Sequence, residues 1–348
     1  MDPLTIAEAR EQWSPSGTYL NTASYGLPPR VAWDALQAVL ADWQSGRTSW
    51  EHWGDSTDAA RAAFGRLVNV APTHVTVGAT VSGLVGPIAA SLPEGTRVVI
   101  PEVEFASLLF PFLVQEQLGR CDVRLVPADR IAEAVDETTD VVAFSAVQMS
   151  TGEVADLDAV AEAAATHGVM TIVDATQAVP WLPIDGSRFD AVACAAYKWL
   201  LSPRGSAFMS VRPERVDEIV PVTAGWYAGE DVHASYFGPP LRLATSARRL
   251  DNSPAWFMWV GTQPALELLE RIGTEAIHAH DVGLASRFRT ALDLEPSNSA
   301  IVSVEIENAQ ERLDRAGVMA ATRGGRLRTS WHVYNTEADV DRVVEALS

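Results

Sequence analysis

The segments VDATQAVP (residues 173–180) and CAAYKWLLSPRG (residues 194–205) decide how this sequence folds. Each begins at the end of a short apolar run, and these runs predict strands at residues 171–174 and 191–194. Strands separated by helical stretches pair in parallel, and the carboxyl ends of neighbouring parallel strands open on one crevice. We therefore expect Asp174 and Lys198 to face each other there.

Lys198 is the only lysine in the chain, because the other 25 of the 26 basic residues are arginines. A guanidinium stays protonated, whereas a desolvated lysine amine can condense with an aldehyde. Taken singly, Lys198 fits a surface position and Asp174 fits a helix N-cap. Together they fit pyridoxal 5′-phosphate, which needs a lysine for its Schiff base and a carboxylate to keep its ring nitrogen protonated.

The composition narrows the class of protein. The 348 residues are 47% apolar and 20% charged, as in ordinary globular proteins, and suffice for a large and a small domain. A net charge of −19 argues against nucleic-acid binding. Cys121 and Cys194 form no CxxC pair, which argues against a disulfide or redox motif. The start MDPLTIAEAREQW is unlike a signal peptide. The uncharged run 75–92 contains three glycines and a proline, which argues against a membrane-spanning helix. We expect a cytoplasmic protein that does not enter membranes.

Apolar runs alternate with alanine-rich helical patterns up to about residue 250, which predicts an α/β domain around a mostly parallel seven-stranded sheet. The other strands are expected at residues 74–77, 97–101, 122–126, 141–145 and 207–211, and the helices at 31–44, 56–67, 81–90, 105–118 and 157–166. A long helix from Ala255 to His280 or beyond, strands at 300–307 and 326–330, and a helix at 337–347 predict a small C-terminal α+β domain. The expected limits are 1–20 for an N-terminal segment that packs on the small domain, 21–250 for the large domain and 251–348 for the small domain.

The order and spacing of these motifs resemble the class V aminotransferase family of fold-type I pyridoxal-phosphate enzymes. That family includes cysteine desulfurases, kynureninase, isopenicillin N epimerase-like proteins and carbon–sulfur lyases. The resemblance runs from YLNTA (residues 19–23) to YNTEAD (residues 334–339). It implies the fold-type I architecture, pyridoxal phosphate as cofactor, an amino acid as substrate and a homodimer.

The resemblance also implies roles for individual residues. Asp174 and Lys198 would be catalytic, and the cofactor would be held by Ala79 and Thr80 of a phosphate-binding turn, Phe105 on the ring, Gln148, Asp174, Gln177 at the ring hydroxyl, Tyr197, Lys198 and, for the partner subunit's phosphate, Ser253. Arg328 would bind the substrate α-carboxylate, with Tyr25 as a second substrate-binding candidate. Each has an ordinary alternative, such as a strand–helix turn at Gly78–Thr80, a core side chain at Phe105 or a surface arginine at Arg328.

The sequence also departs from the family pattern. Many relatives carry a hydroxyl or a histidine just before the lysine to hold the phosphate, whereas this chain has Ala195, Ala196 and Tyr197. No cysteine follows Cys194, so we do not expect the usual persulfide route of cysteine desulfurases. The seven histidines form no zinc pattern, and no metal is expected. An aromatic group formed by Trp50, Trp53, Trp226, Tyr227 and Trp331 fits a pocket roof and core packing equally well.

These observations predict an enzyme that forms an external aldimine with an amino acid, after which Lys198 removes the Cα proton to give a carbanion. We favour β-elimination, as in a carbon–sulfur lyase, because no second arginine for a dicarboxylate substrate is evident. An aminotransferase, an epimerase and a non-catalytic binding protein that keeps the fold are the alternatives. The substrate and the pathway are not specified by the sequence.

Overall fold

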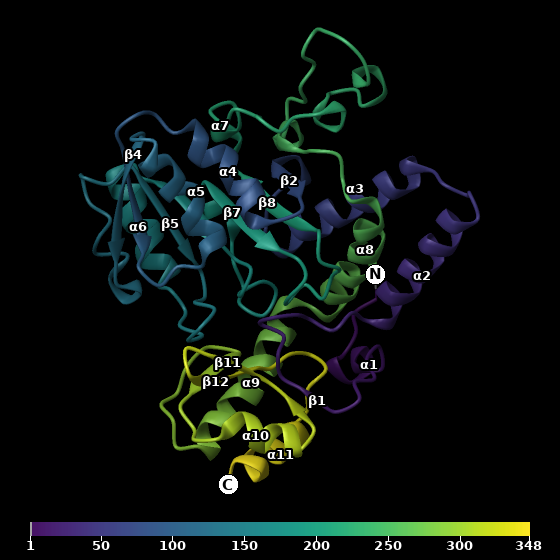
Figure 1. Ribbon diagram of the computed structural model, residues 1–348, viewed down its shortest axis with the longest axis vertical. Coiled ribbons are helices and arrows are strands. Elements are labelled where there is room, and N and C mark those ends of the chain that lie inside the picture. Colours follow the sequence, from purple (N-terminus) through teal and green to yellow (C-terminus); the bar gives the residue numbers. More distant parts are fainter. Residues whose placement is uncertain (1) are drawn as a thin grey trace.

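Seven strands form one sheet in the order β2-β8-β7-β6-β5-β3-β4 in the computed structural model, which describes residues 2–348 (Figure 1). Only β8 runs antiparallel to its neighbours, so the prediction of a mostly parallel seven-stranded sheet is confirmed. The strands are β2 (Val75–Gly78), β3 (Thr96–Pro101), β4 (Cys121–Val126), β5 (Val141–Ser145), β6 (Met170–Asp174), β7 (Ala191–Ala195) and β8 (Ala207–Val211).

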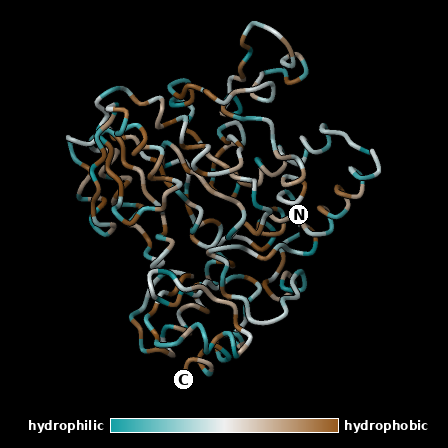
Figure 2. The backbone as a smooth tube through the Cα atoms, viewed as in Figure 1, coloured by the Kyte–Doolittle hydropathy of each residue, from teal (hydrophilic) through white to brown (hydrophobic). Residues whose placement is uncertain are grey.

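Helices cover both faces of this sheet, which explains why its central strands are apolar along their whole length. One core lies between the sheet and α4 (Val81–Ser91) and α5 (Ala106–Gln117). A second core lies on the opposite face, under α3 (Trp50–Leu67), α6 (Leu157–His167) and α8 (Trp256–Ile272). The strands appear brown in the hydropathy view, whereas the outer loops are mostly teal (Figure 2). Helix α2 (Arg30–Gln44) packs on α8, and the short α7 (Pro213–Val216) follows β8.

A second unit lies below the large sheet in the view of Figure 1 and contains the C-terminus. Its sheet is antiparallel in the order β11-β12-β9, with β9 (Ile301–Val304), β11 (Ala321–Arg323) and β12 (Arg326–Ser330). Its helices are α9 (Thr274–Ala291), α10 (Ala309–Arg315) and α11 (Glu337–Leu347). The rings of Phe288 and Trp331 meet in its core, with centroids 5.4 Å apart.

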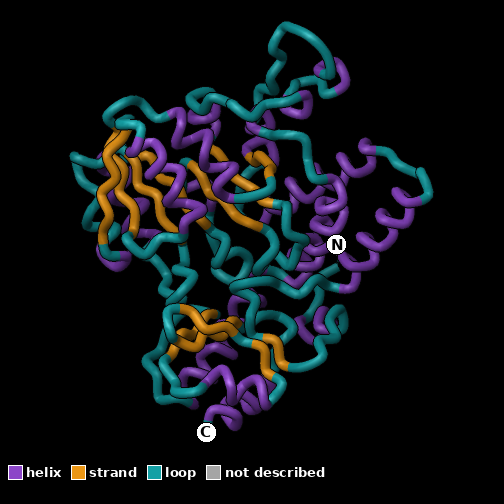
Figure 3. Tube along the Cα trace, in the orientation of Figure 1, coloured by secondary structure: helices purple, strands orange, loops and turns teal. Residues whose placement is uncertain are grey.

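The N-terminal segment packs on this second unit, although the paired residues lie about 300 positions apart in the sequence. After α1 (Ile6–Arg10), the strand β1 (Thr18–Tyr19) pairs in parallel with β10 (Val318–Met319), and Asn21 bridges to Ser330. Figure 3 shows the strands of both units in orange. The domain limits 1–20, 21–250 and 251–348 stay predictions.

The expected continuous helix from Ala255 to His280 is wrong. The chain forms two helices, α8 and α9, that meet at Gly273, where φ is +87° and ψ is 141°. No helical residue has this conformation, and glycine adopts a positive φ without steric cost. Helix α3 likewise begins at Trp50, six residues before the expected start at residue 56. No helix within residues 2–348 is long and apolar enough to cross a membrane.

Candidate functional site

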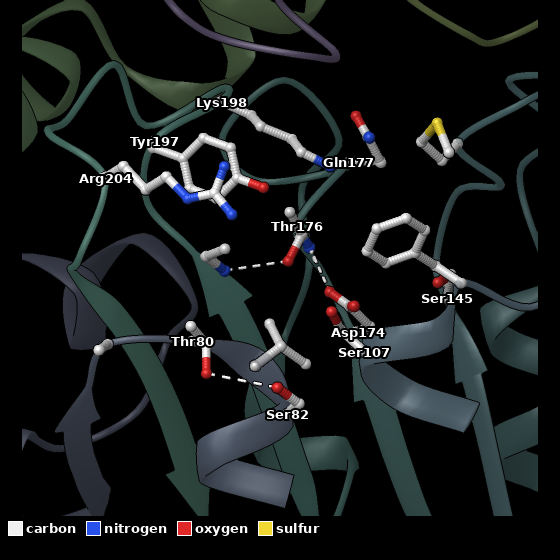
Figure 4. Close-up of a pocket in the computed structure, with 15 residues that line it drawn as sticks. Thr80, Ser82, Ser107, Ser145, Asp174, Thr176, Gln177, Tyr197, Lys198 and Arg204 are labelled. Carbon is white, nitrogen blue, oxygen red and sulfur yellow. Dashed lines mark hydrogen bonds between the residues drawn. The ribbon is translucent and has the colours of Figure 1, made fainter. Parts of the chain in front are cut away.

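A cavity of about 220 Å³ opens at the carboxyl ends of β6 and β7, where the sequence places Asp174 and Lys198 (Figure 4). The two strands are neighbours, with Asp174 in register with Ala193, so the expected juxtaposition is present. The residues that line the cavity are Ala79, Thr80, Val81, Ser82, Phe105, Ser107, Ser145, Met149, Asp174, Thr176, Gln177, Ala195, Tyr197, Lys198 and Arg204.

Lys198 is almost fully buried, with 5% of its surface exposed. Burial lowers the pKa of its amine to about 8, an effect that Asp174 opposes and that Arg328 reinforces. Its Nζ lies 5.3 Å from the centroid of the Phe105 ring and 5.7 Å from that of Tyr197. A substantial fraction of this amine is therefore neutral near pH 8 and available as a nucleophile or base.

Asp174 is buried at the end of β6, and one of its oxygens accepts a hydrogen bond from the Thr176 N–H at 2.8 Å. Burial raises the pKa of this carboxyl, while the Thr176 bonds and Lys198 lower it. Burial disfavours the charged form of a carboxyl, and a nearby positive charge restores it. A buried carboxyl is therefore suited to pairing with a protonated ring nitrogen.

The predicted phosphate-binding turn lies at the junction of β2 and α4, on one side of the cavity. Thr80 is the N-cap of α4, and its hydroxyl accepts from the Gly83 N–H at 3.1 Å. The Ser82 hydroxyl lies 3.4 Å from that of Thr80. Free N–H groups and the dipole at a helix start attract an anion such as a phosphate.

Phe105 lies on another wall of the cavity and precedes α5. The preceding residue, Glu104, is a buried carboxylate that the sequence interpretation missed. It accepts hydrogen bonds from the main-chain N–H of Phe105 and of Ser145, both at 2.7 Å, and from the Gln148 amide at 3.3 Å. Burial raises the pKa of Glu104, although its hydrogen bonds oppose this shift. The structure thus places Gln148 on Glu104 and not among the cavity-lining residues.

Gln177 lines the cavity, but both ends of its amide already have partners. Its nitrogen donates to the Ala23 carbonyl at 3.0 Å, and its oxygen accepts from the Trp199 indole at 2.8 Å. A second N–H of the amide is free to donate to a cofactor hydroxyl. Tyr25 lies at the edge of the site, where its ring contacts that of Tyr197 with centroids 5.0 Å apart.

Arg328 is fully buried on β12 and reaches back to the large unit. Its guanidinium donates to the Met149 carbonyl at 2.9 Å and to the Ser24 hydroxyl at 2.7 Å, and its Nε has no partner. Among residues 2–348, no carboxylate is close enough to form an ion pair with it, and burial lowers its pKa to about 10. Arg323 donates to the same Ser24 hydroxyl at 3.1 Å, so a second arginine lies close to the one expected to bind the substrate carboxylate.

Besides Gln148, Tyr25 and Arg328, which are not among the lining residues, two further groups of predicted residues lie outside this cavity. Ser253 follows Asp251, which is buried against β2 and paired with Arg61 at 2.7 Å, and it is not a lining residue. The aromatic residues divide into three places: Trp50 contacts Trp226, Trp53 contacts Phe257, and Trp331 packs in the second unit. They do not roof the cavity. No cluster of three or more metal-ligating side chains occurs in residues 2–348.

The cavity fits the chemistry of pyridoxal phosphate. It combines a buried amine for the aldehyde, a buried carboxyl for the ring nitrogen, an aromatic ring for stacking and a helix start with hydroxyls for the phosphate. Lys198, Asp174, Phe105 and the turn at Thr80 are the residues that would hold it.

Comparison with known proteins agrees with this chemistry. The model of the family "Aminotransferase class-V" matches residues 19–313. The uncharacterized aminotransferase YcbU of Bacillus subtilis is 25% identical over 86% of this chain and 85% of its own length. Isopenicillin N epimerase of Streptomyces clavuligerus is 25% identical over 98% and 96%, and a probable cysteine desulfurase of Methanothermobacter thermautotrophicus is 24% identical over 83% and 82%.

A solved structure shares the fold over nearly its full length. It is a mutant of the cystine C–S lyase C-DES with glycine covalently linked to the PLP cofactor, which superposes with a TM-score of 0.88 at 20% identity and covers 97% of this chain and 98% of that one. The prediction of the fold-type I architecture is confirmed. The chain belongs to the class V aminotransferase family, and its cofactor is pyridoxal 5′-phosphate.

Proposed function

We propose that this protein removes the Cα proton of an α-amino acid and then eliminates the β-substituent, as a carbon–sulfur lyase does. The single observation that carries the proposal is the buried guanidinium of Arg328, which has no acidic partner in the described chain and influences the pKa of Lys198. A buried cation without a counter-charge is costly, and a substrate α-carboxylate would relieve that cost. Arg guanidinium groups bind carboxylates through two parallel hydrogen bonds.

Two lining residues, Lys198 and Asp174, and the buried Arg328, which is not a lining residue, divide the work as follows. When bound, pyridoxal phosphate supplies an electron sink for negative charge at Cα. Lys198 would hold the cofactor through its amine and would take the Cα proton on Nζ, for which a pKa of about 8 is well matched to neutral solution. Asp174 keeps the ring nitrogen protonated, and Arg328 orients the carboxylate.

The site contains one evident base for Cα. Apart from Lys198 and Asp174, the lining residues that titrate are Tyr197 and Arg204, and burial raises the pKa of the Tyr197 phenol. A single base returns or removes a proton on one face, which suits elimination and transamination better than epimerisation by two opposed bases. The full-length similarity to isopenicillin N epimerase nevertheless keeps epimerisation among the activities to be assayed.

Sulfur transfer to an enzyme cysteine receives no support from the site. Cys121 and Cys194 are both buried, and burial raises the pKa of the Cys194 thiol well above its usual value. Buried, protonated thiols are poor nucleophiles. We therefore propose that a sulfur leaving group departs into solvent, although relatives of this chain are named cysteine desulfurases. Arg323 beside Ser24 favours transamination of a dicarboxylate as the second candidate.

We further propose that the protein is a cytoplasmic homodimer that acts on small amino acids and binds neither nucleic acid nor membranes. The net charge of −19 supports the exclusion of nucleic acid. The segment at Ser253 would then contribute to the partner's phosphate site.

The test uses the purified holoenzyme. Borohydride should attach the cofactor to the only lysine, so that one peptide, the one with Lys198, gains its mass. Incubation with a thioether amino acid should release pyruvate and ammonia in equal amounts. Appearance of the 2-oxo acid of the intact substrate would instead indicate transamination, and loss of optical activity without release would indicate epimerisation. Lys198→Ala should be inactive in all three assays.

A further inference from the structure

Arg204 is the feature of the cavity that the proposed reaction does not use. Besides Lys198 it is the only cation among the lining residues, and Asp174 is the only anion. Lys198 is the group that would bind the aldehyde of the cofactor, so its nitrogen would be committed to that bond. Among the lining residues in the described part of the chain, Arg204 is then the one permanent positive charge left to meet another anionic group.

The phosphate side of the cavity otherwise offers neutral donors. Thr80 and Ser82 present hydroxyls at the start of α4, and the Thr80 hydroxyl already accepts from Gly83. Ala195 and Ala196, which precede Tyr197 and Lys198, supply no hydroxyl next to the lysine. A phosphate monoester carries a charge of about −1.5 to −2 at neutral pH, which neutral donors satisfy only in part.

The position of Arg204 is fixed from two sides. Its Nη1 donates to the Tyr25 hydroxyl at 2.9 Å, and its guanidinium carbon lies 5.0 Å from the centroid of the Tyr197 ring. No acid is close enough to pair with it in the described part of the chain. In Figure 4 it lies beside Tyr197, on the side of the pocket where Thr80 and Ser82 lie, while Asp174 and Ser145 lie on the other side.

We propose that Arg204 binds the phosphate of the cofactor, and that Tyr25 and Tyr197 are positioning residues for its guanidinium. The charge of the phosphate is then met by an arginine six positions after the lysine. This assigns Tyr25, expected from the sequence to contact substrate, to the cofactor instead. The inference rests on the cofactor and not on the reaction, so it stands or falls independently of β-elimination.

The first experiment compares two ligands that differ only in the phosphate. Cofactor is displaced from the holoenzyme with hydroxylamine, and the affinities of pyridoxal phosphate and pyridoxal are measured by absorbance titration. Arg204→Ala should weaken pyridoxal phosphate about 10- to 100-fold, as expected for a lost hydrogen bond to a charged group, and leave pyridoxal unchanged. Arg204→Lys should recover part of the loss, and Tyr25→Phe should show a smaller loss for pyridoxal phosphate alone. Arg342→Ala, which removes an exposed arginine on α11, is the charge-matched control.

The second experiment compares the wild type and Arg204→Ala when both carry the same amount of cofactor. Borohydride fixes the cofactor to Lys198 in both proteins, and the phosphorus resonance is followed with pH. The bound phosphate of the wild type should stay dianionic well below the ordinary second pKa of about 6, and in Arg204→Ala the midpoint should return toward that value. Equal losses for both ligands would mean that Arg204 supports the fold. Unchanged cofactor affinity with weaker binding of acidic amino acids would mean that it contacts substrate. Either result, or identical phosphorus titrations, overturns the proposal.

Discussion

The imidazole of His332 and the main-chain oxygen of Trp199, the residue after Lys198, are joined by a hydrogen bond of 3.0 Å. The other ring nitrogen of His332 lies 2.8 Å from an Asp281 carboxylate oxygen. A carbonyl oxygen only accepts, so Nε2 carries the proton. His332 lies two residues beyond β12, the strand that holds Arg328. The strand that would bind the substrate carboxylate is therefore tied directly to the lysine segment.

This connection predicts different effects for two neighbouring substitutions. His332→Phe removes the bond to Trp199 and leaves the buried Asp281 carboxylate without a donor, so we expect a lower kcat and a lower free energy of unfolding. In Asp281→Asn, Nε2 of His332 can still donate to Trp199, because the new amide can donate to Nδ1. Its kcat should stay close to that of the wild type. Steady-state kinetics and urea unfolding of both variants check this, and equal kcat losses would refute a positioning role for His332.

Because Lys198 is unique, its ionisation is directly observable. In cofactor-free protein grown with lysine labelled with ¹³C at Cε, one resonance should titrate with a midpoint near pH 8. Asp174→Asn should lower the midpoint, since Asp174 raises this pKa, and Arg328→Ala should raise it. Between pH 8 and 10.5 the unfolded chain binds the proton and the folded chain does not, so this group makes stability increase with pH in that window. A midpoint near 10.5 would show that the amine is not desolvated.

Asp174→Asn should retain the cofactor but turn over slowly. The amide still accepts from the Thr176 N–H, so the local fold is preserved, but it cannot hold a proton on the ring nitrogen. We expect kcat to fall by about 10²–10³-fold or more, as when a charge-stabilising group is removed from a transition state. Absorbance confirms cofactor occupancy in the same sample. Near-normal turnover would reduce Asp174 to a structural cap.

Arg328→Ala should lower kcat/KM for an α-amino acid, with a loss of transition-state stabilisation on the order of 2–5 kcal/mol, because the substrate carboxylate would then be buried unpaired. An amine without a carboxylate should lose far less. Arg326→Ala is a control on the same strand, where the side chain is exposed, forms an ion pair with Glu305 and donates to Ser303. If amine and amino acid suffer equally, Arg328 supports the fold; if neither does, the carboxylate is bound elsewhere.

The buried pair between Arg61 and Asp251 predicts a large stability effect. The Asp251 carboxylate also accepts from the Thr76 hydroxyl at 2.8 Å and from the Val77 N–H at 2.9 Å. Arg61→Ala would leave it charged and buried, at a cost of about 3–5 kcal/mol. The exposed pair of Arg97 and Asp140 is the comparison, and Arg97→Ala should cost about 0–1 kcal/mol. Urea unfolding midpoints of the two variants distinguish these values.

The strand pattern and the meeting of Asp174 with Lys198 could be predicted because they depend on local rules. Buried parallel strands require unbroken apolar runs, and consecutive strands of this kind lie side by side. The break at Gly273 escaped because a single glycine inside a helical pattern is usually tolerated, and only tertiary packing decides whether it adopts a positive φ.

The parts of the site that could not be predicted from the sequence depend on contacts between residues far apart in the chain. Glu104 resembled an acid before a helix, and only the fold brings Ser145 and Gln148 to it. Arg204 could not be assigned either, since nothing in the sequence shows that Tyr25, 179 positions away, would hold it. The proximity of Arg323 to Arg328 depends on a serine near the start of the chain.

The pairing of β1 with β10 has a consequence for synthesis on the ribosome. Thr18 meets Val318, so β1 waits for a partner made about 300 residues later, which takes about 15–60 s at 5–20 residues per second. By the time α8 has emerged, the sheet that holds Lys198 and Asp174 has all its strands, while Arg328 does not yet exist. The nascent chain thus completes the sheet that holds Lys198 and Asp174 before it contains Arg328, the arginine that we propose binds the substrate carboxylate.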